Sequence, residues 1–138
     1  MYVENWISTP YEVLQKFEKP TGFYSDNNEQ MRSKSEVIIA NQLKKYKIPY
    51  KYECPLSIGG RMIYPDFTVL NVRKRKELYW EHLGLLDDSD YLEKIITKFI
   101  RYELNGFFPG DKLIITFETS RQPLNVKLVE YTIQKYCK

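Results

Sequence analysis

The stretch Ile63-Tyr64-Pro65-Asp66-Phe67-Thr68-Val69-Leu70 places one carboxylate inside an apolar run that is typical of a buried strand. A second stretch of the same kind, Tyr79-Trp80-Glu81-His82-Leu83-Gly84, follows closely and carries its own carboxylate. An ionised carboxylate is costly to bury unless an opposite charge or a metal ion pairs with it. The two stretches therefore predict adjacent strands whose acids, Asp66 and Glu81, share a partner.

Length and composition set the class of protein. The chain has 138 residues, which fits one domain with its own core, and its net charge of +3 permits a polyanionic partner without requiring one. Cys54 and Cys137 lack metal-site spacing and are too few for a disulfide framework, so we expect free thiols in a reducing compartment. The chain shows no signal peptide and no membrane-spanning run. We therefore predict a cytoplasmic protein without a membrane partner.

The patterns along the chain predict its secondary structure. Residues 1–30 are expected to be irregular apart from a short helix at 11–17, and they resemble a tail cut from something longer, whereas 31–138 form the domain. Within that domain we expect a helix, three strands, a helix, a strand and a helix, at 33–46, 50–54, 62–70, 77–83, 87–105, 112–117 and 124–136. This order is typical of an α/β or α+β layered domain, and we predict an α/β domain with a mixed central sheet flanked by helices.

Three acids stand out as a candidate site. Asp66 and Glu81 lie on adjacent strands of a predicted hairpin, and Glu36 lies on the preceding helix. Converging carboxylates repel each other, and Mg²⁺ is the cation that commonly joins a few protein carboxylates and several waters. A structural interpretation stays open for each acid. Ser33 and Glu36 have capping-box spacing, Asp66 follows a proline at a strand edge, and Glu81 could face solvent.

These residues resemble the PD-(D/E)XK nuclease superfamily. The resemblance rests on Pro65-Asp66, on Glu81 fifteen residues later, and on the preceding helix with Glu36. It covers about residues 30–120 and implies a restriction-endonuclease-like core of the order α-β-β-β-α-β. It also implies that Asp66 and Glu81 bind Mg²⁺, with Mn²⁺ as a substitute, that Glu36 completes the site, and that the main-chain carbonyl of His82 is a further ligand.

The chain departs from that family at its lysine. The usual motif places a lysine two residues after the acid, where this chain has Leu83. The Glu-His-x-Gly sequence resembles branches that take the lysine from the following helix, which makes Lys98 the first candidate and Lys94 the second. A lysine there would orient the attacking water or stabilise developing charge.

Other polar residues receive weaker assignments. His82 is the only histidine, and strand alternation points its ring away from Glu81, so we assign it a positioning role. Basic side chains that could contact backbone phosphates also fit an ordinary solvated surface; they are Lys94, Arg73, Arg75 and Arg121.

The sequence therefore predicts a Mg²⁺-dependent deoxyribonuclease that hydrolyses phosphodiester bonds, with DNA as its partner. The missing motif lysine keeps a second hypothesis open, in which the domain is an inactive nucleic-acid-binding or protein-interaction module. A third hypothesis is a structural domain whose acids pair with Lys or Arg, which predicts no effect of metal on stability. A homodimer or a larger protein assembly is left open, since little of the chain remains for target recognition.

Overall fold

The computed structural model describes residues 1–12 and 17–138. The short helix expected at 11–17 falls mostly on residues 13–16, outside the described part. Residues 2–8 form helix α1 (Tyr2–Ser8), so the expectation of an irregular start was wrong there. This short helix is held by contacts with the sheet: Trp6 Nε1 donates to Glu77 Oε2 at 2.9 Å, and Lys51 Nζ lies 4.4 Å from the centre of the Trp6 ring.

The domain is a mixed α/β structure, as predicted. Its main sheet has the order β1-β4-β5-β6, with antiparallel pairs except for the parallel β5–β6 pair. These strands are β1 (Tyr50–Tyr52), β4 (Phe67–Asn71), β5 (Lys76–Leu83) and β6 (Leu113–Phe117). A separate hairpin pairs β2 (Leu56–Ile58) with β3 (Arg61–Ile63). Its turn is Gly59-Gly60, and both glycines have positive φ angles that suit a tight hairpin.

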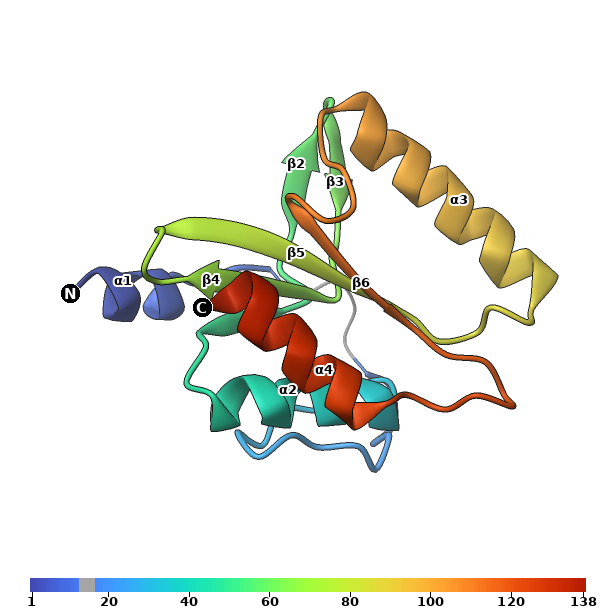
Figure 1. The fold of residues 1–138 in the computed structure, drawn as a ribbon, viewed down its shortest axis with the longest axis horizontal. Helices are drawn as coiled ribbons and strands as arrows, with labels where there is room; N and C mark the ends of the chain where they lie inside the picture. The colour runs from blue at the N-terminus through green and yellow to red at the C-terminus, as the bar shows by residue number, and fades with distance from the viewer. Residues whose placement is uncertain (13–16) are drawn as a thin grey trace.

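Helices cover both faces of the main sheet (Figure 1). On one face lie α2 (Lys34–Lys45) and α4 (Val126–Thr132), which continues as a π-helix over Ile133–Cys137. The larger hydrophobic core lies there, around Trp80 and Phe67. On the other face lie the β2–β3 hairpin and α3 (Ser89–Leu104), with a smaller core around Tyr102. No helix in the described residues has the length and apolar character needed to cross a membrane.

The strand expected at 62–70 is two strands in different sheets. β3 ends at Ile63 and β4 begins at Phe67, with Tyr64-Pro65-Asp66 as the link. The physical reason is Pro65, which lacks an N–H for a strand ladder and restricts the residue before it. Asp66 therefore lies directly before β4 instead of within a strand.

The predicted helix after Arg32 is confirmed. Ser33 is the N-cap of α2, and its hydroxyl accepts the Glu36 N–H at 3.2 Å. The inner face of α2 then buries Ile39, Ala40 and Leu43 against the sheet. This packing fixes the position of Glu36, which lies in the first turn of the helix.

Candidate functional site

The strand register places Asp66 beside Glu81. In the antiparallel β4–β5 pair, Phe67 lies opposite Trp80. Asp66, one residue before Phe67, therefore comes opposite Glu81, one residue after Trp80, because antiparallel strands run in opposite directions. The alternation along β5 points Glu81 to the face covered by α3 and points Trp80 to the face covered by α2 and α4.

Asp66 is held where its negative charge is disfavoured. Its carboxylate is partly buried, and Oδ2 accepts the main-chain N–H of His82 at 2.7 Å. Burial is the largest cause that raises the pKa of Asp66 well above its usual range, and the charges of Glu81 and Glu36 raise it further. The ammonium of Lys98 and the His82 N–H act in the opposite direction. A second positive charge at this point would relieve the repulsion.

Glu81 is buried and engaged by α3. It is 1% exposed, and its Oε2 accepts the Tyr102 hydroxyl at 2.6 Å and lies 2.7 Å from Lys98 Nζ. Lys98 also donates to the main-chain oxygen of Tyr64 at 3.1 Å. Burial first, and then the charge of Glu81, raises the pKa of Tyr102, so the phenol stays protonated as a donor. Of the two candidate lysines, the structure brings Lys98 to the acids and leaves Lys94 exposed.

Glu36 is buried at the start of α2 and serves as a local acceptor. Its Oε1 accepts the Arg32 N–H at 3.0 Å, the Tyr52 hydroxyl at 3.1 Å and the Ser33 hydroxyl at 3.3 Å. Burial is the main cause that raises the pKa of Glu36, and these hydrogen bonds oppose it. Glu36 therefore holds the chain at the start of α2 through the Arg32 N–H and the Ser33 hydroxyl, not through the Ser33 N–H that a capping box would use, and its charge is still felt at Asp66.

The donor atoms available to a metal are few. No group of three or more His, Cys, Asp or Glu in residues 1–12 and 17–138 is arranged to hold a metal ion. Glu36 therefore stands apart from the Asp66–Glu81 pair. Each member of that pair keeps one oxygen, Asp66 Oδ1 and Glu81 Oε1, without a hydrogen bond to another described residue. Two carboxylate oxygens and water suit the preference of Mg²⁺ for few protein ligands.

His82 joins the two faces of the sheet. Its ring lies on the side away from Glu81, as predicted: Nδ1 is 2.8 Å from Thr116 Oγ1 and Nε2 is 2.7 Å from Glu118 Oε1. Its peptide lies at the site, where the N–H binds Asp66 and the carbonyl oxygen is 3.4 Å from the Tyr91 hydroxyl. The anchored ring thus fixes both main-chain groups at the site.

Sequence reasoning missed the residues that hold the site in place. Thr116 is the polar residue of an otherwise apolar strand, and that contrast was a usable signal. Tyr102 lies one helical turn after Lys98 and so shares its face, which was a second signal. Glu118 lies in the loop after β6 and Tyr91 in the first turn of α3, and no pattern in the sequence relates either residue to the site.

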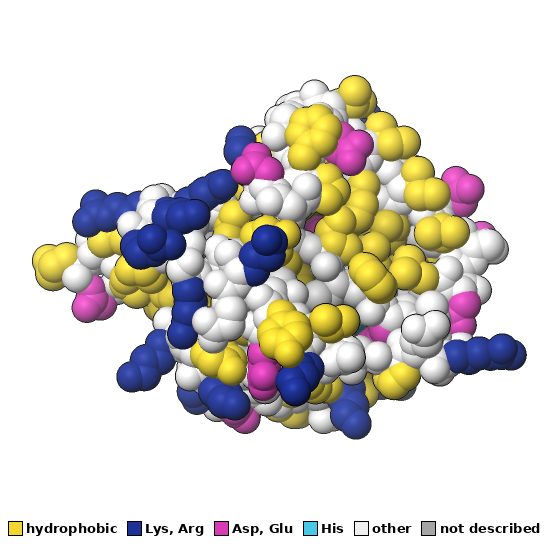
Figure 2. Space-filling model, viewed as in Figure 1, with side chains coloured by type: hydrophobic (Ala, Val, Ile, Leu, Met, Phe, Trp, Pro, Cys, Tyr) yellow, Lys and Arg dark blue, Asp and Glu magenta, His cyan; other side chains and the backbone are white. Residues whose placement is uncertain are grey.

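The predicted basic residues are divided between the two ends of the sheet. Arg73 and Arg75 lie in the β4–β5 turn, where Figure 2 shows Lys and Arg side chains gathered at the left. Five strand residues separate this turn from Asp66, roughly 17 Å of chain, so the structure does not bring Arg73 and Arg75 to the acids. Arg121 follows β6 at the other end, near the hydrogen bond of 2.5 Å from Ser120 to Asp87.

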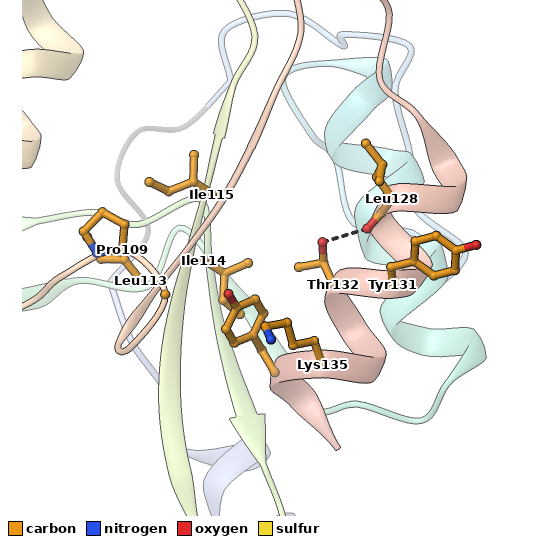
Figure 3. A pocket seen from close by; sticks show the side chains of 10 residues that line it. Pro109, Leu113, Ile114, Ile115, Leu128, Tyr131, Thr132 and Lys135 are labelled. Carbon is orange, nitrogen blue, oxygen red and sulfur yellow. Dashed lines mark hydrogen bonds between the residues drawn. The ribbon is translucent and has the colours of Figure 1, made fainter.

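A groove lies between β6 and α4, away from the acids (Figure 3). It has a volume of about 390 Å³ and is lined by apolar and neutral side chains with one lysine, Lys135. Leu128 and Thr132 of α4 lie across it from Ile115 of β6. No carboxylate lines this groove, so it lacks the metal-ligand oxygens that the Asp66–Glu81 pair offers.

Comparisons with known proteins add one relative. No protein-family model matches the sequence. The chain is similar to an uncharacterized protein of Methanocaldococcus jannaschii, with 38% identity over 85 residues, which is 59% of this chain. The chain spans about 7% of that relative's length.

Proposed function

We propose that this domain is a Mg²⁺-dependent nuclease that hydrolyses phosphodiester bonds of DNA on a restriction-endonuclease-like core. The elements of that core would be α2, β1, β4, β5, α3 and β6, with the β2–β3 hairpin inserted between β1 and β4. The observation that carries the proposal is the contact of 2.7 Å between Lys98 of α3 and Glu81. Through this contact Lys98, from the following helix, would replace the lysine that the motif lacks at Leu83.

Each residue then has a defined role. Asp66 and Glu81 would hold the metal ion, with the carbonyl of His82 beside them and Glu36 acting through water. When bound, Mg²⁺ would lower the pKa of a water molecule and stabilise charge on the phosphate. Lys98 would orient the attacking water or stabilise the charge that develops on the phosphate, and Tyr102 would keep Glu81 in position through its hydroxyl.

The test is a Mg²⁺ and Mn²⁺ titration of the wild type and of Asp66→Ala. Thermal stability would be read together with cleavage of single-stranded, nicked and duplex DNA. We expect metal-dependent stabilisation and cutting, both lost in the variant. Lys98→Ala and Lys94→Ala form a matched pair on one helix, and only the first should abolish cutting. A wild type that responds to neither metal would exclude the proposal.

A second candidate function is an inactive nucleic-acid-binding or protein-interaction module. It is favoured by the buried Leu83 at the motif position and by the engagement of Lys98 with both Glu81 and the Tyr64 carbonyl. In this case Lys98 stays paired with Glu81 and supports no cleavage, while Asp66 and the second oxygen of Glu81 would still bind a metal ion. Metal binding without cleavage of any of the three DNA substrates would favour this function.

A further inference from the structure

Helix α3 carries apolar side chains on two sides but uses only one of them. On the inner side Tyr102 is buried, and Phe99 packs in the smaller core. On the outer side a row of residues is left in solvent: Leu92 is 38% exposed, Ile96 46%, Ile100 53% and Leu104 81%. We call these four residues the outer stripe. Figure 2 shows apolar side chains gathered over α3 at the upper right.

The outer stripe is continuous along the helix. Its members follow one another at intervals of four residues, so they form a single ridge of about 18 Å. Singly exposed apolar residues are ordinary on a protein surface, whereas a contiguous apolar surface marks an interaction site. Ridges built on the four-residue spacing pack well against ridges of the same kind in a second helix. The geometry of the stripe therefore suits a copy of itself.

Charges around the stripe indicate the direction of that second helix. Asp90 and Glu93 lie exposed at its N-terminal end. Arg101 and Arg61, the latter from β3, border Ile100 and Leu104 in a shallow groove at the C-terminal end. Lys94 offsets one negative charge at the N-terminal end and Glu103 offsets one positive charge at the C-terminal end, so the two ends keep opposite net charges.

The outer stripe has self-complementary charges in one orientation. An antiparallel second α3 sets the acidic end of one helix against the basic end of the other. A parallel second α3 would set like charges together. A two-fold axis through the middle of the stripe forms this contact of acidic end with basic end twice, once at each end of the helix pair.

We infer that the outer stripe of α3 is the interface of a symmetric homodimer in which two α3 helices pack antiparallel. The inference does not rest on the nuclease proposal, because it uses neither the metal nor the acids. Lys98 lies on the side of α3 opposite the outer stripe, where it contacts Glu81, so the interface leaves that contact in place. A second copy would also brace a helix that has Tyr102 as its one fully buried side chain.

The experiment is sedimentation velocity of the full chain over a wide concentration range, without metal or DNA. We expect a reversible dimer in the wild type and dissociation at least tenfold easier in Ile96→Asp, since a charge at the centre of the stripe would be buried unpaired. Leu128→Asp is the matched control, because Leu128 is 55% exposed on α4, outside the stripe. This control should leave the dimer unchanged. Leu104→Asp serves as a second stripe variant, and circular dichroism confirms that each variant is folded.

A charge exchange tests the antiparallel direction. Glu93→Arg or Arg101→Glu alone should weaken the dimer, and the double variant should recover it, because the two positions face each other across the two-fold axis. A wild type that remains monomeric up to the millimolar range would overturn the inference. So would a dimer that survives both Ile96→Asp and Leu104→Asp. A dimer without DNA cleavage would leave the interface established and the nuclease proposal refuted.

Discussion

The negative charge of Asp66 is energetically unfavourable in the folded protein. Burial and the neighbouring acids raise its pKa above its ordinary value of 3.8. A carboxyl group with a raised folded-state pKa stabilises the fold fully below its unfolded pKa and loses that contribution as pH rises through the folded pKa. At neutral pH, without metal, Asp66 therefore lowers the free energy of unfolding.

We predict that Asp66→Asn stabilises the metal-free protein at pH 7. The amide keeps an oxygen that can accept the His82 N–H but removes the charge, so the gain should be about 1 kcal/mol, or a few degrees in Tm. Thermal denaturation in a chelator measures it, and the gain should shrink as the pH falls towards 4. Asp87→Asn is the control, since Asp87 is exposed and hydrogen bonds, chiefly from the Ser120 hydroxyl, lower its pKa. A loss of stability in Asp66→Asn would contradict this account.

Lys98 is the counterpart of the buried charge on Glu81. We predict that Lys98→Met lowers the free energy of unfolding by about 2 kcal/mol, because it leaves the Glu81 carboxylate without its cation. Lys94→Met, one turn earlier and exposed, should change it by less than about 0.5 kcal/mol. Urea denaturation of both variants measures the difference.

A double variant separates charge from packing at the same pair. Adding Glu81→Gln to Lys98→Met removes the orphaned charge and keeps an acceptor for the Tyr102 hydroxyl, so part of the lost stability should return. If the double variant is as unstable as the sum of the two single variants, the pair is not coupled as the 2.7 Å contact indicates.

At the scale of elements, β5 and β6 are tied by a side-chain bridge. Trp80 Nε1 donates to Thr116 Oγ1 at 3.0 Å, and Trp is a donor only, so the Thr116 hydroxyl is free to donate to Nδ1 of His82. We predict that Thr116→Val costs about 2 kcal/mol, because two buried polar groups lose their partner. Thr116→Ser should retain most of the stability, and guanidinium denaturation of both variants measures the difference. A larger loss in Thr116→Ser than in Thr116→Val would contradict this account, because it would assign the effect to the methyl group, which valine keeps and serine lacks.

The elements also show what sequence could and could not predict. α2 was predictable, because Ser33 and the apolar spacing of the helix act locally. Pro65 signalled a break in the strand expected at 62–70, but the apolar run around it was interpreted as one strand, and the placement of its two halves in different sheets depends on tertiary pairing. α1 was missed since contacts with the distant Lys51 and Glu77 hold it. At the site, the placement of Asp66 opposite Glu81 followed from the hairpin. The sequence also ranked Lys98 ahead of Lys94, whereas the contact of Lys98 with Glu81 depends on the packing of α3.

On the scale of the whole molecule, the two faces of the sheet differ in how firmly they are covered. The core beneath α2 and α4 is large and includes Trp80, whereas the core beneath α3 is small. α2 buries four residues and α3 buries one. Because the free energy of local opening follows the apolar contacts that must be broken, α3 should be the less stable layer.

We therefore predict that amide hydrogens of α3 exchange faster than those of α2 in native-state exchange, read by mass spectrometry of peptides from residues 89–104 and 34–45. The difference in exchange rate between α3 and α2 should become smaller at high protein concentration, because the second copy then covers the outer stripe. In Ile96→Asp the difference should not depend on protein concentration. Equal protection of the two helices in dilute protein would show that the few contacts around Tyr102 suffice to hold α3. The helix that supplies Lys98 would then need no partner for its stability.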